Sequence, residues 1–139
     1  MPVKNVAVLG GGSFGTVVAN IIAHNNHKTL LWMRDTEQVL SLNNLHENIN
    51  YLPGYKIHED VVATDDLAAA VKDVDLIFVA VPSSSFRDVV QQMQPLIHKD
   101  VILVSLTKGI EAKTFALMSQ ILSEETDNKH IAALSGPNL

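Results

Sequence analysis

Short apolar runs alternate along this chain with longer stretches in which apolar residues recur at helical spacing. The apolar runs predict buried strands at residues 3–9, 28–33, 61–63, 75–81, 101–106 and 130–134. The amphipathic stretches predict helices at residues 14–24, 36–48, 83–97 and 112–122, and a shorter helix that ends near residue 71. Thr36 is the expected cap of the second helix, residues 64–66 are expected to cap the short one, and residues 51–55 predict a turn.

Strands and helices that alternate throughout a chain favour an α/β fold. Parallel strands are joined by crossovers that place helices over the faces of the sheet. We therefore predict one domain with a mostly parallel sheet and helices on both faces. The last predicted strand is followed by a short loop, residues 135–139, so we expect the chain to be part of a longer protein.

A glycine motif stands between the first predicted strand and the first predicted helix. Residues 10–15 read Gly-Gly-Gly-Ser-Phe-Gly and fit the pattern G-x-G-x-x-G. In that position the pattern is typical of a Rossmann-type, doubly wound fold that binds a dinucleotide. Gly10 allows a tight turn, Gly12 lets a pyrophosphate approach the backbone, and Gly15 lets the helix pack close to the strand. The anion would meet free N–H groups at the positive end of the helix dipole.

The end of the second predicted strand carries Arg34 and Asp35, about 20 residues after the glycines. An acidic side chain there could accept a hydrogen bond from the ribose 2′-hydroxyl of NAD. An arginine could pair with the 2′-phosphate of NADP, or stack on the adenine. With both residues present, the sequence leaves the choice between NAD and NADP open.

Other loops should meet at the same edge, because ligands of open α/β sheets collect beyond the carboxyl ends of the strands. Lys108 follows an apolar strand and precedes a glycine. It could reach a phosphate or a carbonyl oxygen, or it could be an ordinary exposed loop lysine. The remaining loops at this edge contain Pro82 with Ser83 and Ser135 with Gly136.

Composition excludes several other classes of protein. A chain of 139 residues with 47% hydrophobic residues can build a core, and a formal net charge of -5 without a basic cluster argues against nucleic-acid binding. The absence of cysteine removes disulfides and thiolate chemistry. No apolar run is long enough to span a membrane, and the N-terminus does not resemble a signal peptide. No metal site is expected, because His24 and His27 fit the end of a helix better than a pair of ligands.

Five segments then follow one another along the chain: VLGGGSFGT at residues 8–16, Asn48 with YLPG at 51–54, AVPS at 80–83, TKGIE at 107–111 and SGPN at 135–138. With these segments the chain resembles the N-terminal domain of the NAD(P)-dependent glycerol-3-phosphate dehydrogenases. The resemblance implies reversible hydride transfer between NAD(P)H and dihydroxyacetone phosphate, which supplies sn-glycerol 3-phosphate for phospholipid synthesis. The implied partners are this cofactor, either NAD or NADP, and this small-molecule substrate, with no nucleic acid and no membrane span.

The resemblance also assigns residues. Ser13 and Phe14 would lie at the pyrophosphate, Arg34 near the adenosine end, and Lys108 would contact both the nicotinamide side and the substrate. The general base and the ligands of the substrate phosphate would belong to a C-terminal helical domain beyond Leu139, through which a homodimer could form. The implied cofactor-binding residues are Gly10, Gly12, Ser13, Phe14, Gly15, Arg34, Pro82 and Lys108; Lys108 is the implied catalytic residue; Lys108, Gly136 and Asn138 are the implied substrate-binding residues.

Two alternatives share the same cofactor fold. One is a nucleotide-sensing module without catalysis, and the other is a related two-domain reductase that acts on a hydroxy acid or ketopantoate. The segments around Lys108 and Gly136 favour glycerol 3-phosphate. Residues 1–139 are accordingly expected to be a dinucleotide-binding domain of a cytoplasmic enzyme, able to bind cofactor but inactive alone.

Overall fold

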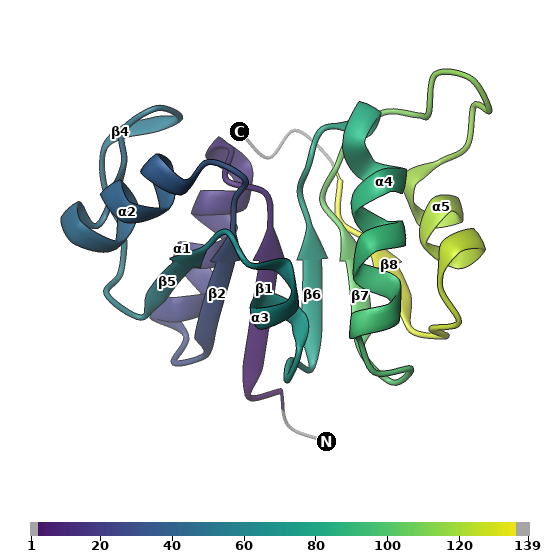
Figure 1. Ribbon diagram of the computed structural model, residues 1–139, viewed down its shortest axis with the longest axis horizontal. Coiled ribbons are helices and arrows are strands. Elements are labelled where there is room, and N and C mark those ends of the chain that lie inside the picture. The colour runs from purple at the N-terminus through teal and green to yellow at the C-terminus, as the bar shows by residue number, and fades with distance from the viewer. Residues whose placement is uncertain (1–2, 136–139) are drawn as a thin grey trace.

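A six-stranded parallel sheet forms the centre of the part of the chain that the computed structural model describes, residues 3–135 (Figure 1). Its strands lie in the order β5-β2-β1-β6-β7-β8, and every neighbouring pair is parallel. This order confirms the predicted Rossmann-type, doubly wound sheet. The strands are β1 (Asn5–Leu9), β2 (Lys28–Trp32), β5 (Val61–Thr64), β6 (Leu76–Val79), β7 (Ile102–Ser105) and β8 (Ile131–Ala133).

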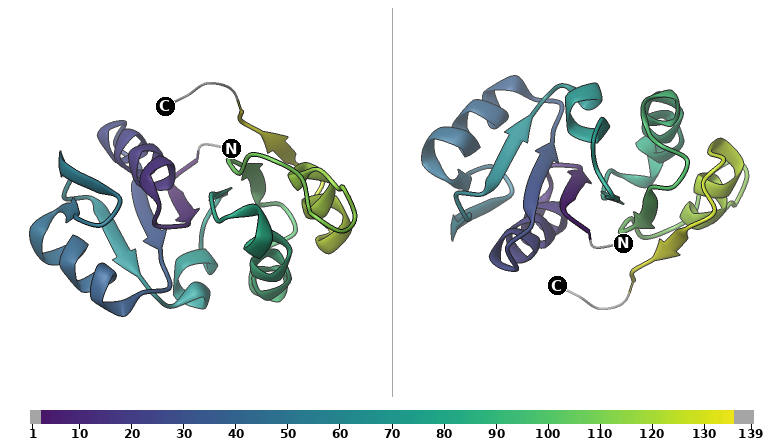
Figure 2. Two further views of the ribbon diagram at one scale, coloured as in Figure 1. Left: turned by 90° about the horizontal axis from the view of Figure 1, so that it is seen from above. Right: turned by 90° about the horizontal axis from the view of Figure 1, so that it is seen from below.

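Helices cover both faces of this sheet, as the views from above and below show (Figure 2). Successive residues of β1 point to opposite faces: Ala7 and Leu9 pack with α3, α4 and α5, whereas Val8 packs with α1 and α2. Burial on both faces explains why β1 is a continuous apolar run. The helices are α1 (Ser13–His24), α2 (Thr36–Leu45), α3 (Leu67–Val71), α4 (Ser83–Met93), the 3₁₀ turn η1 (Gln94–Leu96) and α5 (Met118–Glu125).

Two predictions at α2 are wrong. The cap is Asp35, whose Oδ1 accepts hydrogen bonds from the N–H groups of Glu37 at 2.9 Å and Gln38 at 3.4 Å. The hydroxyl of Thr36 instead donates to the carboxylate of Asp65 at 2.7 Å. The helix also ends at Leu45 and does not reach residue 48, because His46 takes a left-handed conformation with φ of 52°.

Residues 51–55 are not simply a turn. They lie largely in β4 (Leu52–Lys56), which pairs antiparallel with β3 (Glu47–Asn48) outside the main sheet. Gly54, with φ of +78°, stands within this exposed strand. The hairpin is held to α1 by Asn20, which donates to the hydroxyl of Tyr55 and accepts from the N–H of His58.

The predicted helix at residues 112–122 is also misplaced, since α5 begins at Met118. The segment before it is a closed loop in which Ile110 and Leu117 form an isolated antiparallel bridge. Phe115 has φ of 59°, which is incompatible with a right-handed helix. Within residues 3–135, no helix combines the length and the apolarity that a bilayer crossing requires.

Candidate functional site

The carboxyl ends of β1, β2, β6 and β7 open into a pocket of about 610 Å³. The chain runs outward from β1 to β2 and β5 on one side and from β6 to β7 and β8 on the other. The pocket therefore lies where the strand order reverses, the usual ligand site of open α/β sheets. It is lined by residues 10–12, 33–35, 80–83 and 106–108, together with Phe14, Trp32, Gln38, Asn50, Tyr51 and Ser85.

The glycines of the motif have different neighbours. A Cβ on Gly10 would lie 2.5 Å from the carbonyl oxygen of Ala80, and Gly10 has φ of +126°. A Cβ on Gly15 would lie 2.3 Å from the carbonyl oxygen of Gly10. A Cβ on Gly12, in contrast, would meet nothing within 4 Å. Gly10 and Gly15 are therefore required by packing, whereas the space in front of Gly12 belongs to the pocket.

The first turn of α1 faces this space without a cap. Gly12 is the N-cap residue and supplies no side chain, and the first helical hydrogen bond runs from the N–H of Thr16 to the carbonyl of Gly12 at 3.1 Å. The N–H groups of Ser13, Phe14 and Gly15 precede that bond and have no partner within the helix. No acidic residue stands in this first turn. An anion in the pocket would therefore meet unpaired donors and the positive end of the helix dipole, so the residues fit a diphosphate.

Asn48 supports the glycine turn from behind. Its side chain is fully buried, and its Nδ2 donates to the carbonyl of Gly11 and to Oγ1 of Thr16, both at 2.8 Å. Its Oδ1 accepts from Nε2 of Gln38 at 3.0 Å, and Gln38 also donates to the carbonyl of Gly11 at 3.1 Å. In the sequence Asn48 belongs to the segments that carry the resemblance, but nothing in its residue type or position predicts this network.

Arg34 and Asp35 both line the rim of the pocket, but their side chains have different partners. Asp35 caps α2, so its carboxylate is already engaged by backbone donors. The Arg34 side chain is 57% exposed, lies 5.8 Å from the ring centroid of Trp32, and is 3.9 Å from the carboxylate of Asp88. Only weak contacts hold the guanidinium, which leaves it available to a ligand.

On the far side of the pocket, Lys108 is exposed on the loop that follows β7. The residue before it is fixed: Oγ1 of Thr107 donates to the carbonyl of Val81 at 2.6 Å, next to Pro82. Gly109, with φ of +99°, turns the chain immediately after the lysine. Lys108 thus stands across the pocket from the glycine turn, and the structure brings the two together as predicted.

The remaining predicted site residues lie partly in the pocket, partly beside it and partly outside the described residues. Phe14 and Pro82 line the pocket, whereas Ser13 and Gly15 belong to the first turn of α1 beside it. Gly136 and Asn138 lie outside the described residues. Among residues 3–135 no three or more acidic, histidine or cysteine side chains come together as ligands for a metal ion. His24 instead packs its ring edge-on against His58, with the centroids 4.6 Å apart.

Comparison with known proteins decides the family. Residues 5–139 match the family model described as the N-terminus of NAD-dependent glycerol-3-phosphate dehydrogenase. The chain belongs to this family. It is 53% identical over 133 residues to a glycerol-3-phosphate dehydrogenase [NAD(P)+] of Teredinibacter turnerae and 52% identical over 133 residues to the one of Saccharophagus degradans. These matches cover 96% of the chain but 39% and 37% of the relatives, so the chain spans about two fifths of their length.

Solved structures agree. The glycerol-3-phosphate dehydrogenase of Coxiella burnetii superposes with a TM-score of 0.89 at 33% identity, over 98% of this chain and 42% of that one. A ketopantoate reductase of Ralstonia eutropha, at 20% identity and a TM-score of 0.73 over 94% of this chain and 40% of that one, shares the fold alone. The family expected from the five sequence segments and the fold class expected from the alternating strands and helices are therefore confirmed.

Proposed function

We propose that residues 1–139 are the cofactor-binding domain of an NAD(P)-dependent sn-glycerol-3-phosphate dehydrogenase. The observation that carries the proposal is the open space at Gly12 in front of the uncapped first turn of α1, in a chain of this family. The enzyme would interconvert dihydroxyacetone phosphate and sn-glycerol 3-phosphate and so supply phospholipid synthesis. NAD(P)H, when bound, supplies the hydride.

The residues of this chain would bind the cofactor and orient it toward the substrate. The N–H groups at the start of α1 donate to the diphosphate, and Phe14 and Pro82 shape the pocket beside it. The guanidinium of Arg34 contacts the adenosine end, where it accommodates a 2′-phosphate or stacks on the base. Lys108 places a positive charge near the substrate carbonyl oxygen, where negative charge develops during reduction.

The substrate-binding part of the active site would be completed by residues near and beyond the end of this chain. Gly136 and Asn138 would contribute to the substrate surroundings, and a C-terminal helical domain beyond Leu139 would supply the general base and the phosphate ligands. Relatives more than twice as long as this chain support that division. We place the enzyme in the cytoplasm and expect that any homodimer forms through the C-terminal domain.

The test is a steady-state assay of the full-length protein with dihydroxyacetone phosphate and NADH or NADPH. Lys108→Ala should lower kcat by about 100-fold and change cofactor affinity little, because the lysine acts mainly on the developing charge. Lys113→Ala, an exposed lysine of the same loop, is the matched control and should keep full turnover. Unchanged turnover in Lys108→Ala would remove this lysine from the mechanism.

Residues 1–139 alone should bind cofactor with little or no turnover. Robust turnover by this piece would refute the division of labour between the two domains. Binding of NADH by the full-length protein without turnover of any such substrate would instead favour a nucleotide-sensing module.

A further inference from the structure

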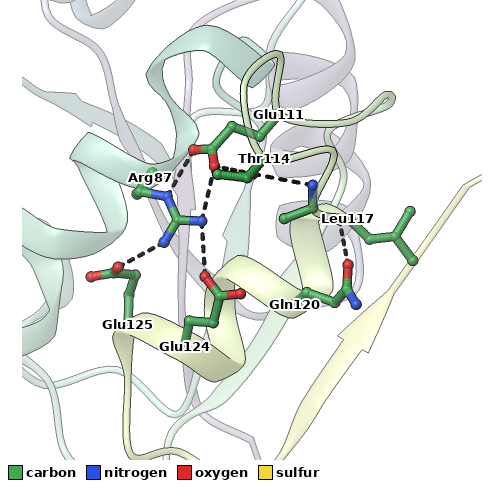
Figure 3. Close-up of polar contacts among 8 residues, drawn as sticks. Arg87, Glu111, Thr114, Leu117, Gln120, Glu124 and Glu125 are labelled. Carbon is green, nitrogen blue, oxygen red and sulfur yellow. Dashed lines mark hydrogen bonds and ion pairs between the residues drawn. The ribbon is translucent and has the colours of Figure 1, made fainter.

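Arg87 joins α4 to the Lys108 loop and to α5 through a cluster of carboxylates (Figure 3). Its Nε and one terminal nitrogen donate to the two oxygens of Glu111 at 2.7 and 2.9 Å. The same terminal nitrogen lies 2.8 Å from Glu124, and the other donates to Glu125 at 2.7 Å. Two parallel hydrogen bonds from one guanidinium to one carboxylate are the strongest arrangement for arginine. The contact with Glu111 therefore fixes the orientation of both side chains in addition to pairing their charges.

Arg87 and Glu111 each lie within four residues of a residue that lines the pocket. Arg87 lies one helical turn after Ser83, the first residue of α4, and Ser83 lines the pocket. Glu111 lies three residues after Lys108. The pair therefore ties the Lys108 loop to the helix whose N-terminal end borders the same pocket.

The loop around Glu111 is closed by its own hydrogen bonds. The N–H of Glu111 donates to the carbonyl of Ala116, the N–H of Phe115 donates back to the carbonyl of Glu111, both at 2.9 Å, and the Thr114 hydroxyl donates to the Glu111 carboxylate. The loop is thus a compact unit, which Thr107 anchors before Lys108 and Glu111 anchors after it. The segment between these anchors contains Gly109, which gives little stiffness of its own.

The Glu111 side chain is 20% exposed, and the hydrogen bonds from Arg87, followed by that from Thr114, lower its pKa to about 2. The carboxylate therefore stays charged at every pH at which the enzyme would work. Arg87 itself is 25% exposed. A partly shielded network with several short contacts keeps more of its strength than an isolated surface pair.

We propose that Arg87 and Glu111 are positioning residues that hold the Lys108 loop against α4 and thereby fix where Lys108 stands in the pocket. This inference rests on the proposed function of Lys108. Reaction rates are sensitive to displacements of about 1 Å in a group that acts on the reacting atoms. Loss of the anchor should therefore affect turnover more than binding of the cofactor, whose diphosphate site is made by the first turn of α1.

The chain offers a matched pair of variants. Glu111→Ala removes one carboxylate from Arg87 and frees the Lys108 loop, whereas Glu124→Ala removes one carboxylate from the same arginine but leaves the loop anchored. Each leaves Arg87 with two carboxylate partners. Both are made in the full-length protein, alone and in the Lys108→Ala background, and Tm is measured for each.

Glu111→Ala should lower kcat about 10-fold and leave the cofactor KM within about 2-fold, and Glu124→Ala should leave both within about 2-fold. In the Lys108→Ala background, Glu111→Ala should change kcat by less than about 2-fold, because it acts through the lysine. If Glu111→Ala does not fold, Glu111→Gln replaces it; because glutamine keeps one oxygen that can accept from Arg87, kcat should fall in the same direction by a smaller factor.

Three results would overturn the positioning role: full turnover in Glu111→Ala, an equal loss in Glu124→Ala, or an undiminished effect of Glu111→Ala when Lys108 is absent. All three presuppose that Lys108→Ala lowers turnover. If Lys108→Ala itself turns over normally, the proposed function of Lys108 fails instead, so the two failures are distinguishable.

Discussion

Replacement of Gly12 by valine separates cofactor binding from folding. Gly12 has φ of -75° and ψ of -176°, an extended conformation that valine readily adopts, and a Cβ at this position meets no atom within 4 Å. The fold should therefore accept Gly12→Val. The free energy of unfolding should change by less than about 1 kcal/mol, and in the stabilising direction, because valine restricts the unfolded chain.

Cofactor binding should respond differently. The valine methyl groups would occupy the space in front of the first turn of α1, so that a diphosphate could no longer approach the N–H groups there. The loss of about two hydrogen bonds to a charged group, each worth about 1.5–3 kcal/mol, amounts to about 3–6 kcal/mol. Because about 1.4 kcal/mol corresponds to a tenfold change, the Kd for NADH should rise at least about 100-fold.

The assay is a fluorescence titration of the 139-residue chain with NADH. Trp32 is the single tryptophan of this chain and lines the pocket, so its emission reports binding alongside that of NADH. Gly15→Ala is the contrasting variant: its Cβ would lie 2.3 Å from the carbonyl oxygen of Gly10, and overpacking of this kind costs about 1–3 kcal/mol of stability. Wild-type affinity in Gly12→Val would show that no diphosphate rests at this turn. A fall in its Tm as large as that of Gly15→Ala would refute the claim that the space is free.

Three further changes test other parts of the site. Asn48→Ala should lower the free energy of unfolding by about 2–4 kcal/mol in denaturant titration and weaken NADH binding, because the buried Asn48 side chain makes several hydrogen bonds behind the glycine turn; a wild-type denaturation midpoint would contradict this. Arg34→Ala should weaken NADPH more than NADH in parallel titrations if the guanidinium meets a 2′-phosphate, and equal effects would assign it to the base. Glu111 has a folded pKa of about 2 against an ordinary 4.5, so it stabilises the fold above pH 4.5 and loses that effect as pH falls from 4.5 to 2. The Tm difference between wild type and Glu111→Gln should therefore shrink over that range, and a constant difference would show that the charge is not involved.

The central sheet was predictable because β1, β2, β6 and β7 are largely apolar: β1 is buried on both faces, and along β6 and β7 buried residues alternate with apolar residues that are only partly covered. The chain contains few other runs of that kind. The packing role of Gly10 and Gly15 was predictable from residue type alone. Only a residue without a side chain allows backbone atoms to approach as closely as those around Ala80 and Gly10 do.

The misplaced elements share a different cause. The hairpin of β3 and β4 lies outside the main sheet and is mostly exposed, so it carries no apolar alternation to announce it. Residues 112–117 have a composition that a helix tolerates, but the Ile110–Leu117 bridge and the bonds of Glu111 close them into a loop. Interactions between segments far apart in sequence decide these conformations, and a local pattern does not contain them.

The residues of the site also fall into two groups. The groups that face the pocket, such as the glycine turn and Lys108, follow strand ends and could be found from the sequence. The groups that hold them are Asn48 of β3, behind the turn, and Arg87 of α4, which binds Glu111 of the Lys108 loop. In the sequence both look like ordinary polar residues. Because the backbone amides of the glycine turn and the side chain of Lys108 are held in place by these supports, the geometry of this part of the pocket depends on them. Substitutions that damage the site without touching a ligand should therefore concentrate at the supporting positions.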